Sequence, residues 1–293
     1  MRSVALIVNP NASAVTPALV DRVAAELERG GPVELLRTSG PGHAGELARA
    51  ASADAIVAFG GDGTYNEVLN GLVRDVPLGL VPGGGTSVLP RALGLPRDPV
   101  VCAARIAAST TTRRISLGRA NGRRFAFSCG VGMDAELVRR VDAHGRANGR
   151  RPGDAVFLLE LAKLLGSQGF HLRPRLRVEG MGEAALAVIA NGDPYTYVGR
   201  LAVRPSPQAS FEGGLDLVAP HDVGPLGIGR VAWWTIVRPG PLTRRADVVH
   251  AHDADRIVIT AEQPVAIQVD GEDLGDVHRL EVVAERGAVS ILV

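Results

Sequence analysis

The sequence predicts an α/β domain built on a parallel sheet, followed by a β-rich domain that we expect to be a sandwich. In the N-terminal part, short apolar runs alternate with helical patterns, an order typical of a parallel sheet with helices on both faces. After Pro99–Ala108 the pattern changes to short apolar runs with little helix between them. The chain of 293 residues also exceeds the usual length of one compact domain. We therefore expect one domain over residues 1–115 and a second over residues 116–278.

The expected strands of the first domain are apolar runs that each end at turn residues. These runs are Val4–Val8, Val33–Leu36, Ala55–Phe59 and Leu78–Val81. Helical patterns follow them at residues 19–27, His43–Ala51, Tyr65–Val73 and Pro99–Ala108. Parallel strands place their carboxyl ends at one edge of the sheet, and ligands bind beyond that edge. The residues that we expect to converge there are Asn9, Thr38, Gly60–Asn66 and Gly84–Ser87.

The segment Gly60–Thr64, with the sequence GGDGT, follows the third strand and precedes a helix. Glycines let the backbone approach a ligand, and the unpaired N–H groups of a helix N-terminus attract an anion. This order predicts a phosphate-binding loop, with Thr64 and Glu67 as a capping box for a helix from Tyr65. The carboxylate of Asp62 would repel phosphate unless a divalent cation lies between them, which favours a metal–nucleotide complex. The alternative is a tight turn in which Asp62 is only a cap.

A second glycine-rich turn, Pro82–Thr86, follows the fourth strand. Proline is tolerated in the first turn of a helix, so Pro90 places the start of the next helix at about Thr86. This start predicts a second anion site, because the first amides of the helix would face the loop. These amides are those of Ser87, Val88 and Leu89. The alternative is that the glycines form a flexible link.

The second domain contains many expected strands and two helical segments. The strands are Ile115–Leu117, Arg124–Cys129, Arg175–Val178, Ala184–Ala190, Gly214–Val218, Arg256–Thr260, Val265–Val269, Arg279–Val283 and Val289–Val293. The helical segments are Ala135–His144 and Ala155–Leu165, joined by the basic segment Arg146–Gly153. Near the end of the chain, Asp270-Gly271 predicts a hairpin turn that presents Glu272. By itself such a turn is structural and needs no function.

Composition excludes several classes of protein. A hydrophobic content of 46% and a charged content of 22% fit a folded chain, and a net charge of +1 indicates no nucleic-acid partner. Lys163 is the only lysine, so a Walker loop is excluded and phosphate must be held by backbone N–H groups, Arg and metal. Cys102 and Cys129 lie in apolar stretches and are expected to fill the core. No apolar run is long enough to cross a bilayer and no signal peptide is recognised, so we expect a cytoplasmic protein.

Taken together, these motifs resemble the diacylglycerol kinase catalytic domain family, which includes sphingosine kinases and soluble bacterial lipid kinases. The resemblance covers nearly the whole chain in order. Its motifs are NP at 9–10, Thr38 before a helix, GGDGTYNEVLNGL at 60–72, LVPGGGT and RALGLP within 80–96, SCGVGMDAE at 128–136, EGGLDLV at 212–218 and VDGE at 269–272. GGDGT alone is shared with NAD kinases, whereas its combination with RALGLP and a late DGE is specific.

The resemblance implies an ATP-dependent lipid kinase that phosphorylates a hydroxyl of a diacylglycerol- or sphingoid-like lipid. It also implies that residues 279–293 return to the first domain. Glu272 would be the base that takes the proton of the acceptor hydroxyl, Asp62 would join an Mg²⁺ network, and Glu212 lies in a loop where the family has a structural metal. The residues implied to hold ATP are Asn9, Thr38, Gly60, Gly61, Asp62, Gly63, Thr64, Tyr65, Asn66, Gly84, Gly85 and Thr86.

The chain departs from the family at usually acidic positions. Val88 occupies the slot of an Asp in the second glycine loop, and Ser116 stands where an acidic residue is frequent. Gly85, Ser87 and Pro90 also replace the usual Thr, Asn and Ala of that loop. A weakened kinase, or a lipid- or nucleotide-binding protein without turnover, therefore stays an alternative. NAD kinase is the enzyme alternative, because it shares the fold and GGDGT.

A lipid substrate implies contact with a membrane surface. The candidate residues are Phe157, Leu158, Leu161, Leu164 and Leu165 beside Arg146–Arg151, and Trp233-Trp234 near Arg238, Arg244 and Arg245. The alternative is that these apolar residues belong to the core, as apolar stripes at helical spacing usually do. A peripheral position at the inner face of the membrane and a homodimer are both compatible with the sequence.

Overall fold

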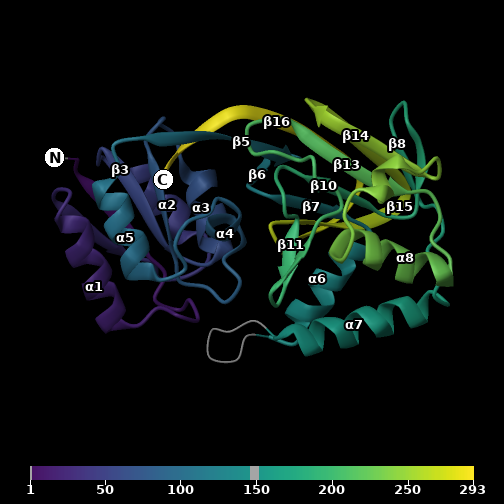
Figure 1. Ribbon diagram of the computed structural model, residues 1–293, viewed down its shortest axis with the longest axis horizontal. Helices are drawn as coiled ribbons and strands as arrows, with labels where there is room; N and C mark the ends of the chain where they lie inside the picture. Colours follow the sequence, from purple (N-terminus) through teal and green to yellow (C-terminus); the bar gives the residue numbers. More distant parts are fainter. Residues whose placement is uncertain (1, 146–151) are drawn as a thin grey trace. The chain divides into compact units, whose positions relative to one another are not determined.

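A computed structural model describes residues 2–145 and 152–293 (Figure 1). The chain divides into two compact units. The first unit contains the described residues up to Ile115 together with Gly287–Val293. The second contains the described residues from Ser116 to Arg286. The last segment of the chain thus belongs to the first unit from Gly287 onward, later than the expected start at residue 279.

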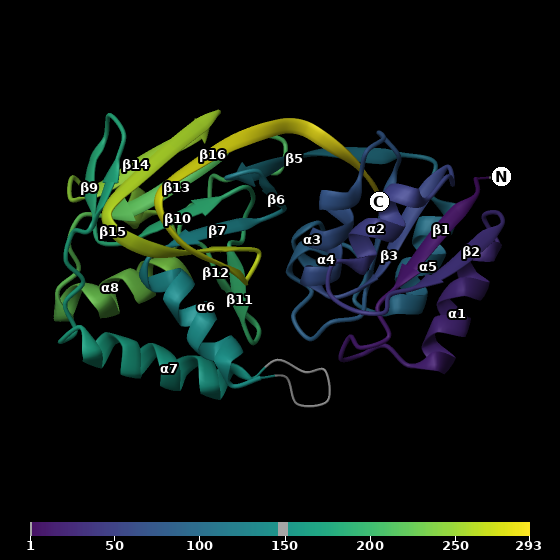
Figure 2. The same cartoon turned by 180° about the vertical axis from the view of Figure 1, so that it is seen from behind.

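The first unit is a parallel sheet with helices between its strands. Its elements are β1 (Val4–Val8), α1 (Pro17–Glu28), β2 (Val33–Arg37), α2 (His43–Ala50), β3 (Ala55–Gly60), α3 (Asp62–Gly71), β4 (Leu78–Pro82), α4 (Val88–Ala92), α5 (Pro99–Ala108), the start of β5 (Thr112–Ala120) and the end of β16 (Glu272–Leu292). The strands lie in the order β16–β4–β3–β1–β2, and all neighbours are parallel. Figure 2 shows β1 between β2 and β3. β1, β3 and β4 are buried throughout, as expected of apolar runs covered on both faces. The predicted α/β domain is confirmed.

Local sequence signals predict where two helices of the first unit begin, but not where α3 begins. α1 and α5 begin as their sequences indicate, each with a proline at the start behind a side-chain cap, Thr16 or Asp98. α3 differs, because it begins at Asp62 and Gly61 supplies no side-chain cap. The predicted capping box is therefore wrong. Glu67 instead accepts a hydrogen bond from the backbone N–H of Ala44, 3.1 Å away, and so joins α3 to α2.

The second unit is built mainly from antiparallel strands. It contains the rest of β5 and of β16, with β6 (Arg123–Phe125), β7 (Ser128–Val131), α6 (Met133–Ala143), α7 (Asp154–Ser167), β8 (Leu176–Val178), β9 (Gly182–Ala184), β10 (Ala187–Ala190), β11 (Thr196–Val198), β12 (Leu201–Val203), β13 (Leu215–Pro220), α8 (Pro225–Ile236), a 3₁₀ turn (Pro241–Arg244), β14 (Val248–Ala254) and β15 (Arg256–Val269). The main strand order is β14–β13–β10–β7–β15–β16. Phe125, Leu217 and Ile267 belong to its main core cluster. The expected β-rich domain is confirmed.

Three features of the second unit differ from the expected elements. Residues 256–269 form one strand with register shifts instead of two strands, and β16 likewise joins two expected strands. α8 is an additional helix in an apolar stretch for which no helix was predicted. Figure 1 shows α6, α7 and α8 together on one side of the strands. Most of the basic segment Arg146–Gly153 lies outside the described residues. Among the described residues, no helix is long and apolar enough to cross a membrane.

Candidate active site

Three loops meet at the carboxyl edge of the parallel sheet in the first unit. The N–H of Gly83 donates to the carbonyl of Gly60 at 2.7 Å, and the N–H of Ala14 donates to the carbonyl of Gly83 at 2.9 Å. A Cβ on Gly84 would lie only 2.8 Å from the Cα of Gly61. The two glycine loops therefore touch through their backbones, and side chains at these points are excluded.

Asn9 joins the loop after β1 to the first turn of α3. Its Nδ2 donates to Oγ1 of Thr64 at 3.0 Å, and its backbone N–H donates to the carbonyl of Phe59 at 3.0 Å. Thr38, at the end of β2, is buried and donates its N–H to the carbonyl of Val8. The loops after β1 and β3 are thus held by direct contacts, and Thr38 lies next to β1 at the same sheet edge.

Asp62 connects the two glycine loops. Its Oδ2 accepts a hydrogen bond from the N–H of Val88 at 3.0 Å, and its Oδ1 accepts one from the N–H of Leu89 at 3.2 Å. The helix α4 begins at Val88, after Ser87 with φ 47° and ψ 60°, and not at Thr86. Two of the three amides expected to form a second anion site, those of Val88 and Leu89, are therefore bound by a carboxylate of the protein itself.

Tyr65 and Asn66 are buried in the first two turns of α3. The Tyr65 hydroxyl lies 2.8 Å from the carbonyl oxygens of both Gly60 and Val81, and burial raises the pKa of this hydroxyl well above its usual value. The side chain of Asn66 is buried and its Oδ1 accepts from Nδ2 of Asn70 at 3.1 Å. Tyr65 thus joins the ends of β3 and β4 from inside the fold, a role that its position in a glycine-rich motif did not indicate, whereas the contact of Asn66 with Asn70 lies within α3.

The turn Asp270-Gly271-Glu272 joins β15 to β16 in the second unit. Asp270 and Gly271 have φ values of 49° and 79°, as a tight hairpin turn requires. The buried carboxylate of Asp270 accepts hydrogen bonds from the N–H groups of Ala126, Phe127 and Ser128 at 2.7, 2.9 and 3.1 Å. The turn is therefore fixed to the connection between β6 and β7.

Glu272 has a different environment from Asp270. Its side chain is 33% exposed, and its Oε2 lies 3.6 Å from Nη2 of Arg123. The two carboxylates of the turn thus have different roles. Asp270 holds the backbone, whereas Glu272 is presented at the surface beside a guanidinium.

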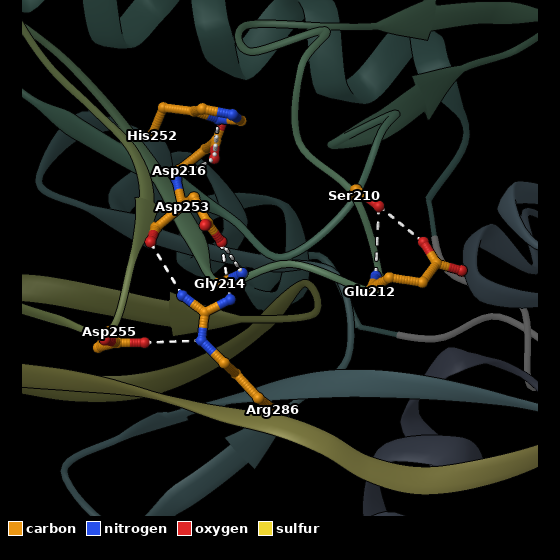
Figure 3. A network of polar contacts seen from close by, with 8 residues as sticks. All are labelled: Ser210, Glu212, Gly214, Asp216, His252, Asp253, Asp255 and Arg286. Carbon is orange, nitrogen blue, oxygen red and sulfur yellow. Dashed lines mark hydrogen bonds and ion pairs between the residues drawn. The ribbon is translucent and has the colours of Figure 1, made fainter.

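Glu212 lies in a loop that a guanidinium stabilises (Figure 3). Its Oε2 accepts from the hydroxyl of Ser210 at 2.6 Å. Nearby, Asp253 accepts from the N–H of Gly214 at 2.6 Å and from Nη1 of Arg286 at 2.8 Å, and Arg286 also donates to Asp255 at 2.7 Å. The described residues contain no group of three or more His, Cys, Asp or Glu side chains that could hold a metal ion. Arg286 is the cation that pairs with the carboxylates of this network, and the metal at Glu212 stays a prediction.

The two usually acidic positions hold buried residues. Val88 is 3% exposed, and its N–H is the donor to Asp62. Ser116 is fully buried, and its N–H donates to the carbonyl of Phe211 at 2.6 Å. Neither position brings a carboxylate to the site.

Comparison with known proteins agrees with this arrangement. Residues 3–120 match the model of the diacylglycerol kinase catalytic domain. Over these residues the chain is similar to that family, and the match supports a lipid kinase.

The similarity to individual members of this family extends beyond the first unit. The diacylglycerol kinase of Bacillus subtilis (strain 168) is 29% identical over 240 residues, which are 78% of this chain and 75% of that protein. A diacylglycerol kinase structure from Bacillus anthracis str. Sterne superposes with a TM-score of 0.73 at 21% identity, covering 99% of this chain and 96% of that one. An NAD kinase from Archaeoglobus fulgidus in complex with ATP gives a TM-score of 0.52 at 16% identity, with coverage of 99% and 93%. The two structures show a shared fold.

Proposed function

We propose that the protein is a lipid kinase that transfers the γ-phosphoryl group of ATP to a hydroxyl of a diacylglycerol- or sphingoid-like lipid, with Glu272 as the base. The observation that carries the proposal is the division of roles in the turn of residues 270–272. Asp270 is buried and bound to three backbone N–H groups, so it cannot reach a substrate. Glu272 is the carboxylate of this turn that remains partly exposed. A family catalytic domain in the first unit supports ATP as the donor.

The first unit supplies groups suited to the phosphates of ATP. The loops at Gly60–Thr64 and Gly84–Thr86 are in backbone contact, and the first turn of α3 carries N–H groups without acceptors inside the helix. Phosphoryl transfer proceeds through a loose transition state with charge spread over the equatorial oxygens. Positioning and electrostatic stabilisation are therefore the main requirements, and backbone N–H groups can contribute to both.

Asp62 fits a role as a single protein ligand of Mg²⁺. Its two oxygens accept backbone hydrogen bonds from Val88 and Leu89, which fix the position of the carboxylate between the two glycine loops. Mg²⁺ in kinases is usually bound by one or two carboxylates together with substrate phosphates and waters. When bound, the ion would neutralise charge on the phosphates. The N–H groups of Val88 and Leu89 would hold the carboxylate of Asp62 in place.

Glu272 would accept the proton of the lipid hydroxyl as that oxygen attacks the γ-phosphorus. Its neighbour Arg123 orients the carboxylate without burying it. A general base of this kind adds about 10²–10⁴-fold to the rate.

We also propose that the enzyme works from the cytoplasm at the inner face of the membrane, since its acceptor lies in a bilayer.

The test is phosphoryl transfer by the purified protein with Mg-ATP, a panel of diacylglycerols and sphingoid bases, and NAD as a separate acceptor. Glu272→Gln should slow transfer to the best lipid by about 10²–10⁴-fold while ATP binding, measured by calorimetry, stays unchanged. The exposed Glu262→Gln is the matched control and should leave the rate unchanged. Transfer to NAD alone would favour the NAD kinase alternative, and ATP or lipid binding without turnover would favour a binding protein. A Glu272→Gln protein with a normal rate and an unchanged acid limb in its pH profile would remove Glu272 from the mechanism.

A further inference from the structure

We propose that Gln268 is a positioning residue for Glu272, and that Tyr195 and Asp134 hold Gln268 in place. The inference rests on the proposed role of Glu272 as the base. Gln268 lies on β15 and is 2% exposed. Its Oε1 accepts a hydrogen bond from the N–H of Gly271 at 2.8 Å, immediately before Glu272. The buried side chain of Gln268 thus binds the backbone of the turn that carries Glu272.

The other end of the Gln268 amide enters a buried polar network. Its Nε2 lies 2.8 Å from Oδ2 of Asp134 and 2.9 Å from the hydroxyl of Tyr195. The same hydroxyl donates to Oδ2 of Asp134 at 2.8 Å. These contacts connect β15 to α6 and to the segment before β11. Because both ends of the amide are used, Gln268 cannot rotate without losing a hydrogen bond in the interior, where an unmade bond is costly.

The surrounding backbone leaves room for this network. Gly130, on β7, lies opposite Gln268 in the strand register. A Cβ on Gly130 would collide with the carboxylate of Asp134 and would lie 2.8 Å from Nε2 of Gln268. A side chain at position 130 is therefore incompatible with the network. Burial raises the pKa of Asp134, and the hydrogen bonds from Tyr195 and Gln268 partly oppose this rise.

Contacts bracket Glu272 on both sides. Before it, Asp270 is bound to three N–H groups, and Gly271 is bound to Gln268. After it, Asp273 forms an ion pair with Arg139, whose Nε lies 2.9 Å from Oδ2. Asp270 and Asp273 fix the ends of this segment, and Gln268 fixes the peptide next to the base. A catalytic group misplaced by about 1 Å can lose about 10²-fold in rate.

The test compares Gln268→Leu with the wild type. Leucine has a similar size and cannot accept from Gly271, so the turn should loosen while the core stays filled. We expect kcat to fall by about 10- to 100-fold with an unchanged KM for ATP, because the ATP groups lie in the other unit. Gln263→Leu, an exposed substitution on the same strand, should leave kcat unchanged. A folded Gln268→Leu protein with the wild-type kcat would overturn the proposal.

A double variant separates positioning from a general effect on the fold. If Gln268 acts through Glu272, then adding Gln268→Leu to Glu272→Gln should slow transfer no further. Effects that multiply would overturn the positioning role. A normal rate for Glu272→Gln alone would instead refute the proposed base. If Gln268→Leu does not fold, Tyr195→Phe, which retains the ring, replaces it in the same comparison. A kcat that Tyr195→Phe lowers in the wild type but not in the Glu272→Gln protein supports the proposal. An unchanged kcat in the wild type overturns it.

Discussion

At the scale of single residues, two aspartates in glycine-containing turns use their carboxylates to bind backbone. Asp62 accepts from two N–H groups of the neighbouring loop, and Asp270 accepts from three N–H groups between β6 and β7. In both cases the donors are far away in the sequence. An acidic residue in such a turn therefore meets a folding requirement as well as any chemical one.

This arrangement predicts a structural cost for Asp62→Asn. The amide oxygen of asparagine can accept from Val88 or Leu89 at the original positions, but its NH₂ group would face the other N–H. We expect a loss of about 1–3 kcal/mol in the free energy of unfolding, together with loss of phosphoryl transfer. Denaturant unfolding and lipid phosphorylation are the two measurements. Asp21→Asn, an exposed substitution on α1, is the control. Wild-type stability with no transfer would limit Asp62 to the phosphate chemistry, and wild-type values of both would refute its role in either.

The convergence of the loops was predictable from sequence, whereas the directions of their side chains were not. Apolar runs that end at Asn9, Gly60 and Pro82 indicate parallel strands, and such strands share a carboxyl edge. The resemblance to the diacylglycerol kinase family implies that Tyr65 helps to hold ATP. Its hydroxyl in fact reaches the carbonyls of Gly60 and Val81, and the latter contact depends on how β4 pairs with β3. Local sequence carries no information on that pairing.

At the scale of elements, α7 and α8 carry exposed apolar side chains and also contribute side chains to one buried cluster. Leu161 and Ile228 pack around one buried cluster that includes Leu165, so part of the predicted membrane-facing set belongs to the core. We define the α7/α8 surface by the side chains that stay exposed. These are Leu158 and Leu159 on α7, and Leu226, Trp233 and the following Val237 at α8. Arg230 and Arg245 lie over the ring of Trp234, which adds positive charge beside this surface.

We predict that the α7/α8 surface binds anionic bilayers. The double variant Leu226→Ser, Trp233→Ser should weaken sedimentation with vesicles containing phosphatidylglycerol by about tenfold or more, because burial of one large apolar side chain contributes about 1.5–3 kcal/mol. Val101→Ser is the matched control, since Val101 is exposed on α5 in the first unit. Equal binding of the wild type to neutral and anionic vesicles would contradict the contribution of the arginines.

The network around Arg286 predicts that the thermal stability of the ligand-free protein does not depend on a metal ion. Its guanidinium already pairs with Asp253 and Asp255, so removal of divalent cations with EDTA should leave the thermal midpoint of the ligand-free protein unchanged. Arg286→Leu should lower that midpoint by leaving the two carboxylates without their cation. A midpoint that falls in EDTA and recovers with Mg²⁺ would show that a metal does bind in the protein.

The same network predicts that the stability contributed by Asp253 depends on pH. The hydrogen bond from the N–H of Gly214, followed by that from Arg286, lowers the pKa of Asp253 below its ordinary value of 3.8. A carboxyl whose pKa is lower in the folded state stabilises the fold above its unfolded pKa, and this contribution is lost as pH falls through the folded value. Asp253→Asn should therefore be less stable than the wild type at neutral pH, and the difference should shrink below about pH 3.8. Thermal unfolding across this range tests it, and a constant difference would contradict it.

At the scale of the whole molecule, the two compact units are not consecutive in the chain. β5 and β16 each begin in one unit and end in the other. Hydrophobic periodicity was sufficient to predict a parallel sheet followed by β-rich structure. It could not predict that the chain returns, because the pairing of Ile291 with Leu78 joins residues at opposite ends of the sequence. Only the resemblance to a known family indicated it.

The returning segment predicts that the first unit needs the last residues of the chain. Val289, Ile291 and Leu292 are each at most 2% exposed, and β16 is the neighbour of β4. Burial of each such side chain contributes about 1.5–3 kcal/mol, and a domain has only about 5–15 kcal/mol of stability in total. A chain that ends at Arg286 should therefore lose the fold of the first unit and its ATP binding. Limited proteolysis should then cleave first within residues 2–115, while the second unit resists. A truncated protein that binds ATP normally and resists proteolysis throughout would show that β4 does not require this strand.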